Sequence, residues 1–348
     1  MKKNILTLII KTAGILLTAW VLLTVLDGIF TPKYITENRD GNVTAEFYDV
    51  ETPLDVVFFG SSTVYNAVAP DLLWEKYGFT SYTRANASQT LWQSYYLIRD
   101  TVKNNRPKVI TLDMSFMKYG EDFFEEASNR KAIDGMRLSP DKMMCARASM
   151  WKEESLYSYI FPILRFHSRW DELKGEDYRY AIKRPQVTYD GFIPEFGRVE
   201  HPEEFDPIIK DDFSFPAKSE KYLEMIIDYC AKEDIPLLLM KTPTFINTWV
   251  PEYDRQLETI AGEHENCDYV NFDESAGVIG LKRDEDYIDG HSHLNVKGAE
   301  KFSGFFGQYI RDRYDLPDHR GDDTYSSVWD DRYTRYCVDI QNHPQNDR

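Results

Sequence analysis

Short apolar runs alternate with amphipathic stretches along most of the chain. Buried strands are predicted where residues are mostly apolar and rich in β-branched or aromatic types, at 55–59, 108–114, 235–241 and 269–272, and a weaker strand pattern lies at 81–85. Helices are predicted where apolar positions recur with helical spacing, at 70–77, 91–105, 221–233, 251–261 and 296–314. Such alternation favours a parallel sheet covered by helices on both faces. The sequence therefore predicts an α/β fold, a flavodoxin-like three-layer sandwich with about five parallel strands.

Residues 118–216 interrupt this alternation after the third strand. They are aromatic and acidic, and they are too many to form a structureless loop, so we expect a long insertion or a cap over the sheet. A basic and aromatic cluster lies inside the insertion. Its members Arg165, His167 and Arg169 either clamp an anionic or sugar substrate or form ion pairs with surface carboxylates.

The amino terminus carries the most apolar segment of the chain. Residues 5–26 are long enough to cross a bilayer as a helix, and the positive charges of Lys2 and Lys3 precede them. That charge asymmetry predicts a cytoplasmic amino terminus and an extracytoplasmic soluble domain. A cleaved signal peptide and a buried soluble helix are the alternatives. The length of the run and the lack of a small-x-small site argue against the first, and its all-round apolarity argues against the second.

These patterns divide the chain into five parts. We expect a cytoplasmic tip and single-pass cell-membrane anchor at 1–30, a stalk at 31–53 and an α/β domain formed by 54–117 and 217–316. The insertion at 118–216 and a surface tail at 317–348 complete the chain.

Composition excludes some classes of partner. The net charge of -17 disfavours binding to nucleic acid. The cysteines are far apart and contain no CxxC pair, so they indicate neither a metal site nor a disulfide framework, although one or two disulfides are left open. The cysteines are Cys145, Cys230, Cys267 and Cys337.

Polar residues follow the predicted strands at the points where chemistry is expected. Gly60, Ser61 and Ser62 follow the first strand, residues 86–89 follow the second, and an Asp- and His-rich stretch at 286–295 precedes the last helix. The carboxyl ends of parallel strands meet at one edge of the sheet. Since a serine nucleophile needs a base and an imidazole base needs an orienting carboxylate, these segments predict a Ser-His-Asp site.

Two of these segments carry a family resemblance. The sequence FFGSS at 58–62 and the sequence DGHSHLNVKGAEKFS at 289–303 resemble the first and last conserved blocks of the SGNH (GDSL-type) hydrolase superfamily. The resemblance implies that Ser62 is the nucleophile, with Ser61 in the place of the usual Asp. It also implies that His293 is the general base and Asp289 its orienting carboxylate. The likeness covers most of residues 54–314.

The chain departs from the family pattern in the spacing of the acid. The family usually has Asp-x-x-His, whereas Asp289 lies four residues and Asp286 seven residues before His293. Both aspartates therefore stay open as the acid. His291 is an alternative base, although His293 is the one followed by the family's Leu-Asn.

The oxyanion hole departs further. The resemblance places oxyanion or substrate contacts at Gly60, Asn86, Ser88 and Gln89, but no glycine follows the second strand and no asparagine follows the third. A replacement donor can come from the insertion or from the turn after Lys241. That lysine, at a strand end, either contacts substrate or is solvated.

With its anchor and aromatic insertion, the chain is similar to membrane-bound members that handle acyl groups on cell-envelope polymers. We expect a membrane-anchored serine esterase or O-acyltransferase acting on acyl groups of cell-envelope glycans, with acetyl as the expected group. Its partners are then an acylated glycan or other small ester and the lipid bilayer, and the chemistry needs no metal or cofactor. The alternatives are a weakly active or inactive polysaccharide-binding component, and metal-dependent hydrolysis with His291, His293 and Asp289 as ligands.

Overall fold

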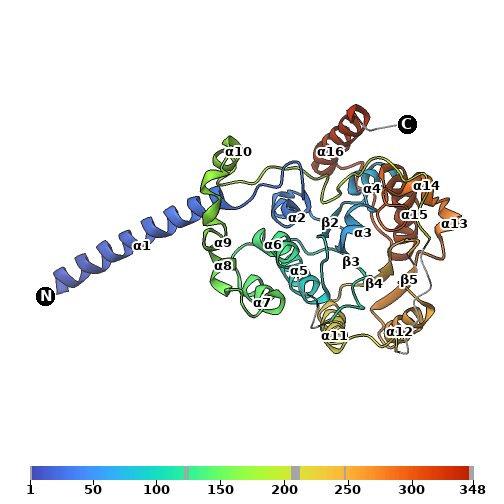
Figure 1. Cartoon of the computed structure of the whole chain (residues 1–348), viewed down its shortest axis with the longest axis horizontal. Helices are drawn as coiled ribbons and strands as arrows, with labels where there is room; N and C mark the ends of the chain where they lie inside the picture. The colour runs from blue at the N-terminus through green and yellow to red at the C-terminus, as the bar shows by residue number, and fades with distance from the viewer. Residues whose placement is uncertain (1, 121–122, 124, 205–211, 247, 345–348) are drawn as a thin grey trace.

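A parallel five-stranded sheet in the order β2-β1-β3-β4-β5 lies at the centre of the fold (Figure 1). This computed structural model describes residues 2–120, 123, 125–204, 212–246 and 248–344. The order is that of flavodoxin-like sheets, so the predicted fold class is confirmed. The strands are β1 (Val56–Gly60), β2 (Ser81–Ala85), β3 (Val109–Asp113), β4 (Leu237–Lys241) and β5 (Cys267–Asn271).

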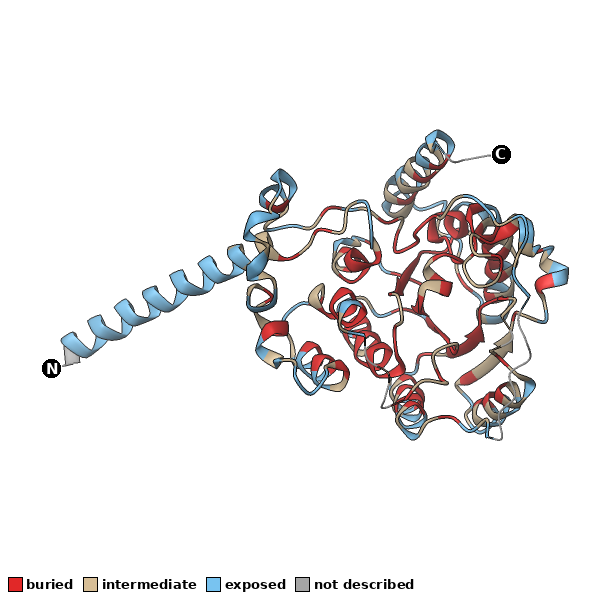
Figure 2. Cartoon of the chain, in the orientation of Figure 1, coloured by how far each residue is buried: buried red, intermediate tan, exposed pale blue. Residues whose placement is uncertain are grey.

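Helices cover both faces of the sheet because successive strand residues point to opposite sides. In β1, Val57 and Phe59 join one core cluster and Val56 and Phe58 join the other. Figure 2 shows β1 to β4 buried between the two helical layers, whereas the edge strand β5 is mostly half-buried. One layer contains α5 (Leu91–Asn104), α11 (Ala217–Lys232) and α12 (Pro251–Gly262); the other contains α4 (Pro70–Tyr77) and α15 (Val296–Tyr314), with α13 (Ala276–Ile279) and α14 (Arg283–Asp286) against α15.

Local stop and start signals set several boundaries where the sequence predicts them. Pro70 occupies the first turn of α4, and Gly78 ends that helix in the left-handed conformation with a φ of 78°. The Asn295 side chain caps α15 by accepting a hydrogen bond from the Gly298 N–H. By contrast, α11 begins at Ala217, four residues before its predicted start, directly after Pro216.

Residues 31–53 are part of the domain and do not form the expected stalk. They contain α2 (Asp40–Glu46) and the 3₁₀ helix η1 (Phe47–Asp49). Val43 and Phe47 lie four residues apart on one helical face and are both buried in the core. The Tyr82 hydroxyl donates to the Val43 carbonyl at 2.7 Å, which ties α2 to β2.

In the residues that the structure describes, the insertion forms six short helices that extend the α5 layer toward α1. In it, α7 packs on α5 and α6 packs on α2, so these helices lie beside the sheet and not over its carboxyl edge. The returning segment, residues 189–204, does reach that edge, where the Ile193 N–H donates to the Tyr65 carbonyl at 2.9 Å. The elements are α6 (Glu126–Asp134), α7 (Pro140–Ser149), α8 (Leu156–Ile160), α9 (Ile163–Phe166), η2 (His167–Asp171) and α10 (Gly175–Arg179).

The amino-terminal helix α1 (Lys2–Phe30) projects away from the domain (Figure 1). By length and composition, the helix at Asn4–Phe30 is apolar enough to cross a membrane. Its side chains are exposed over most of its length (Figure 2).

The carboxyl-terminal segment, expected as a surface tail, ends in the long helix α16 (Asp323–Asn342). This helix packs against α4, where Trp329 stacks on Trp74 with ring centroids 5.9 Å apart. One face of α16 is thus part of the core. All four cysteines are free thiols in the structure, and Cys145, Cys230 and Cys267 are buried.

Candidate active site

The turn after β1 places Ser62 at the carboxyl edge of the sheet. Ser61 is the N-cap residue and Ser62 the first residue of the short helix α3 (Ser62–Tyr65). A Cβ at Gly60 would lie 2.4 Å from Val64 Cγ2 and 2.8 Å from Asp113 Cβ, so a larger residue does not fit there. The glycine therefore lets the chain turn tightly enough to present Ser62.

His293, which lies 231 residues after Ser62 in the sequence, links Ser62 to Asp289. Its Nε2 lies 2.8 Å from Ser62 Oγ, and its Nδ1 lies 2.6 Å from Asp289 Oδ2. An ionised carboxylate only accepts hydrogen bonds, so the Asp289 contact assigns the imidazole proton to Nδ1 and leaves Nε2 free to accept from Ser62. The three side chains have the connectivity of a nucleophile, a base and an orienting acid.

Asp289 is held as a carboxylate by its surroundings. Partial burial opposes ionisation, but hydrogen bonds from the His293 ring and from three backbone amides hold the pKa of Asp289 well below its usual range. Asp289 Oδ1 accepts the N–H groups of His291, Ser292 and His293 at 3.0, 2.8 and 3.2 Å. Because the folded-state pKa is depressed, these contacts stabilise the fold above roughly pH 4 and the contribution is lost as the pH falls further.

The other candidate acid, Asp286, has a different set of partners. Its buried carboxylate accepts two hydrogen bonds from Lys301 Nζ, at 2.9 and 2.7 Å, and one from the Lys282 amide at 2.8 Å. These contacts tie α14 to α15. Asp286 therefore stabilises the contact between α14 and α15, and the carboxylate beside the His293 ring is Asp289.

The alternative base, His291, lies on the same loop. Its Nδ1 is 2.6 Å from Ser292 Oγ and 3.5 Å from Asp289 Oδ2, whereas the ring that reaches Ser62 belongs to His293.

Within the described part of the chain, no group of three or more His, Cys, Asp or Glu side chains is arranged to hold a metal ion. Gly290 has a φ of 75°, which permits the tight loop that joins Asp289 to His293 at the unusual spacing of four.

The turn after β2 brings Asn86 and Gln89 together as a brace. Asn86 Nδ2 donates to Gln89 Oε1 at 3.0 Å, and Gln89 Nε2 donates to Ser94 Oγ at 3.0 Å. Both side chains are buried and committed to these partners. Since the Asn86 N–H also donates to the Gly60 carbonyl at 3.3 Å, the brace fixes this turn against the one that holds Ser62.

Backbone amides near Ser62 are the candidate oxyanion donors. Among the described residues, no intramolecular hydrogen bond uses the N–H of Ser62 or of Ser88, whereas the Ala87 N–H donates to Asp40 Oδ2 at 3.0 Å. Ser88 has a φ of 55°, a left-handed conformation that favours glycine. A serine thus adopts this backbone shape after the second strand, where the resemblance expects a glycine.

We expect Ser88→Gly to keep full activity and to gain up to about 1 kcal/mol of stability, because glycine adopts a positive φ without the cost that an L side chain incurs. Ser88→Val, whose β-branched side chain opposes that conformation, should lower kcat on a simple ester by about tenfold or more. Steady-state kinetics and thermal melts of both variants give the comparison. Equal kcat values in the two folded variants would show that the Ser88 amide is not an oxyanion donor.

A cavity of about 530 Å³ lies beside α3, and sequence reasoning missed it. Tyr65, one helical turn after Ser62, lines it together with polar residues from three distant segments. Burial raises the pKa of Glu195, and the positive charge of Arg39 opposes that rise. The lining residues are Thr36, Glu37, Asn38, Arg39, Asp40, Tyr65, Ala87, Lys131, Ile193 and Glu195.

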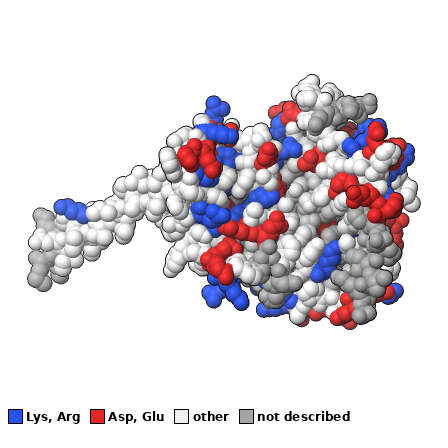
Figure 3. Space-filling view, viewed as in Figure 1, with Lys and Arg blue, Asp and Glu red and all other residues white. Residues whose placement is uncertain are grey.

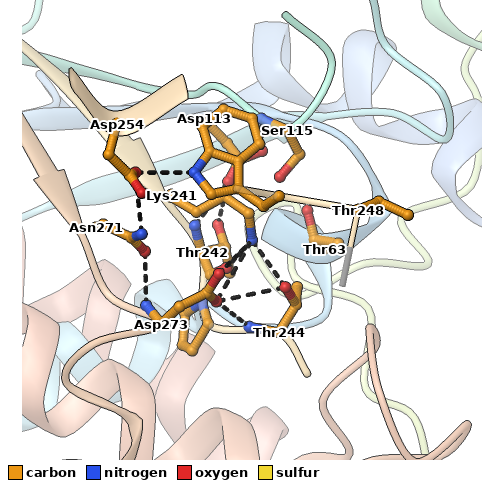
Figure 4. A network of polar contacts seen from close by, with 12 residues as sticks. Thr63, Asp113, Ser115, Lys241, Thr242, Thr244, Thr248, Asp254, Asn271 and Asp273 are labelled. Atoms are coloured by element: carbon orange, nitrogen blue, oxygen red, sulfur yellow. Dashed lines mark hydrogen bonds and ion pairs between the residues drawn. The ribbon is translucent and has the colours of Figure 1, made fainter. Parts of the chain in front are cut away.

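Lys241 lies at the centre of a polar network (Figure 4). Its buried Nζ donates to the Thr242 carbonyl at 2.7 Å and to Thr244 Oγ1 at 2.9 Å, and lies 3.4 Å from Asp273. Burial raises the pKa of Asp273, and Lys241 opposes that rise. Phe245, which follows Thr244, donates its N–H to the His291 carbonyl at 2.7 Å. Lys241 is therefore neither solvated nor free for substrate, and it stabilises the turn that supports the histidine loop.

The basic cluster of the insertion lies at the base of α1, away from Ser62. Arg165 pairs with Glu126, and Arg169 donates to the Phe30 carbonyl and pairs with Asp177. The ion-pair alternative for these arginines is thus the one that the structure displays.

Comparisons with known proteins add little to this geometry. No protein-family model matches the chain, and no curated protein matches it. A solved structure from Streptococcus pneumonia, described as a candidate platelet activating factor, is 10% identical. The similarity covers 86% of this chain and 99% of that one, with a TM-score of 0.39. A likeness at this level says nothing about activity.

Proposed function

We propose that the chain is a membrane-anchored serine esterase or O-acyltransferase, with Ser62 as nucleophile, His293 as general base and Asp289 as orienting carboxylate. The observation that supports this most strongly is the continuous hydrogen-bonded chain from Ser62 Oγ through His293 to Asp289, with contacts of 2.8 and 2.6 Å. The Ser62 side chain stands at the carboxyl edge of a parallel sheet, where α/β enzymes commonly bind substrate. The resemblance to SGNH hydrolases assigns the same three residues.

Each residue has a defined step in this mechanism. His293 Nε2 removes the Ser62 proton as Oγ attacks the ester carbonyl, and the amides of Ser62 and Ser88 stabilise the oxyanion. The C–O bond of the ester breaks, and the leaving alcohol takes the proton from His293. Water or an acceptor hydroxyl then attacks the acyl-enzyme and gives its proton to His293, which returns it to Ser62. Asp289 stays ionised throughout and stabilises the imidazolium.

The substrate that we propose is an O-acylated glycan of the cell envelope, with acetyl as the acyl group. The cavity beside Tyr65 supports a hydroxyl-rich ligand because Arg39, Lys131, Asp40 and Glu195 supply donors and acceptors on its wall. Anchoring by α1 would hold the soluble domain at the extracytoplasmic surface, where such glycans occur. No tightly bound metal or cofactor takes part in this chemistry.

A fluorophosphonate probe tests the nucleophile directly, since it reacts covalently with an activated serine. We expect the wild-type chain to be labelled and Ser62→Ala to be unlabelled. Ser61→Ala is the matched control, because Ser61 is the adjacent buried serine and its Oγ contacts Thr63 Oγ1 at 3.1 Å. This variant should still be labelled. Lack of labelling of the folded wild type, or labelling that persists in Ser62→Ala, would contradict the proposal.

Release of acetate from an O-acetylated oligosaccharide then tests the substrate class. A labelled enzyme that releases no acetate from the glycan, with water or with a glycan acceptor present, would keep the serine chemistry and reject the proposed substrate.

A further inference from the structure

Exposed large apolar side chains are concentrated in one stretch of the insertion. Among the described residues outside α1, nine of them lie between 138 and 182, and two, Val278 and Val338, lie elsewhere. A soluble surface normally carries such side chains singly, so a concentration of this kind marks an interaction surface. Those between 156 and 182, here called the collar, are Tyr157, Leu164, Trp170, Tyr178 and Ile182.

The segment that carries the collar, residues 156–182, packs around the last turns of α1. The ring of Phe161 meets that of Trp20 edge-on, with centroids 6.0 Å apart. The Ile163 N–H donates to Asp27 Oδ1 at 2.8 Å. At Gly28, an added Cβ would lie 1.6 Å from the Ala181 carbonyl oxygen, so the two backbones are in direct contact. Figure 1 shows α8, α9 and α10 grouped where α1 leaves the domain.

These contacts fix the depth of the collar relative to a spanning α1. A bilayer core about 30 Å thick takes about 20 residues of helix at 1.5 Å each. A window of that length beginning at Ile5 ends near Thr24, and any later window ends closer to Phe30. Trp20 therefore lies inside the apolar layer, about four residues or 6 Å from its outer boundary. Phe161, in contact with Trp20, must lie at or below that boundary.

We infer that the collar is immersed in the interfacial layer of the outer leaflet and is a second membrane-binding element beside α1. This inference rests on the proposed membrane anchor. The partner is the lipid bilayer, because the segment that carries the collar contacts the spanning helix directly, at Trp20 and Gly28. Figure 3 shows α1 as an uncharged surface from its one blue patch to the domain. Trp and Tyr are the residues that favour the boundary between headgroups and acyl chains.

Apolar burial, not attraction to anionic lipid, drives this contact. The segment that carries the collar, residues 156–182, has four basic and four acidic side chains. Of the basic ones, Arg165 pairs with Glu126 and Arg169 pairs with Asp177. Paired charges contribute little to attraction by an anionic lipid surface. Binding of the collar should therefore occur on neutral lipid and vary little with salt.

Two attachments would hold the candidate site at a set height. The cavity residue Thr36 follows the end of α1, Phe30, by six residues, a span of at most about 20 Å even when fully extended. With the collar immersed, the domain cannot swing freely about a linker. The glycan substrate must therefore reach the site close to the bilayer, as a membrane-attached glycan would.

Spin labels on the full chain in phosphatidylcholine nanodiscs test the depth of the collar. Labels are placed at Tyr157→Cys and Trp170→Cys in a Cys337→Ser background, because the other three cysteines are buried. Ile15→Cys reports the spanning part of α1, and Val278→Cys is the matched aqueous control, since that valine is 81% exposed. Collision with oxygen, which partitions into lipid, is compared with collision with a water-soluble nickel chelate.

The inference predicts that the oxygen-to-nickel ratio at positions 157 and 170 is several-fold above that at 278 and approaches that at 15. Values at 157 and 170 equal to that at 278, with 15 in lipid, would overturn the collar and keep the anchor. An aqueous value at 15 would overturn both. Shielding of 157 and 170 from both reagents would show that a second copy covers the collar, which also overturns the inference.

Discussion

Asp289→Asn is expected to lower kcat for ester turnover by about 10⁴-fold, whereas Asp286→Asn leaves kcat within a few-fold of wild type. An amide at position 289 cannot hold the proton on His293 Nδ1 as a carboxylate does, so Nε2 loses its role as the acceptor for Ser62. Asp286 contacts Lys301 and the Lys282 amide, and its replacement removes a tie between α14 and α15 instead. The comparison is kcat measured on a simple ester with folded protein.

The two variants separate chemistry from folding because their losses should appear in different measurements. Asp286→Asn should lower the midpoint of thermal unfolding while fluorophosphonate labelling of Ser62 persists. Asp289→Asn should slow labelling sharply even where thermal unfolding shows a folded domain. A large fall in kcat for folded Asp286→Asn, with Asp289→Asn near wild type, would assign the acid to Asp286 and contradict the geometry.

The sheet was predictable because its residues carry strong local signals. The strands β1, β3 and β4 are mostly apolar and are buried on both faces, whereas β2 carries the weaker pattern Ser-Tyr-Thr-Arg-Ala. Pro70, Gly78 and Asn295 mark helix ends by backbone geometry that few other residues share. The contact between Ser62 and the histidine loop was predictable for a topological reason, since both were expected at the carboxyl edge of one parallel sheet.

The cavity was not predictable, because its walls come from irregular segments. Residues 36–39 precede α2, and Asp40 is its first residue. This helix of seven residues is too short to be stable without tertiary packing and leaves little periodic pattern. Glu195 lies on a returning segment whose position is set by long-range hydrogen bonds, such as that from the Val296 N–H to the Glu195 carbonyl at 2.9 Å. No spacing rule links either segment to Ser62. The depth of the collar depends likewise on a contact between Trp20 and Phe161, far apart in sequence.

The network around Lys241 leads to the largest expected effect on stability. Lys241→Met should lower the free energy of unfolding by about 2–3 kcal/mol, because it leaves Asp273 and the Thr242 carbonyl without their cation. This is below the loss of about 3–5 kcal/mol for fully buried pairs, since the Asp273 side chain is 23% exposed. Urea unfolding measures the change. Lys282→Met, which removes an exposed partner of Glu285, is the control and should stay near wild type.

Adding Asp273→Asn to Lys241→Met should restore part of that stability, because the amide is no longer an unpaired charge. The kcat lost in Lys241→Met should not recover in parallel. The Lys241 network positions Thr244, and the neighbouring Phe245 N–H supports the His291 carbonyl, so the double variant still lacks a cation to fix that turn. Recovery of stability without recovery of kcat would identify Lys241 as a positioning residue for the histidine loop. A double variant as unstable as Lys241→Met alone would show that the ion pair is not what the lysine contributes.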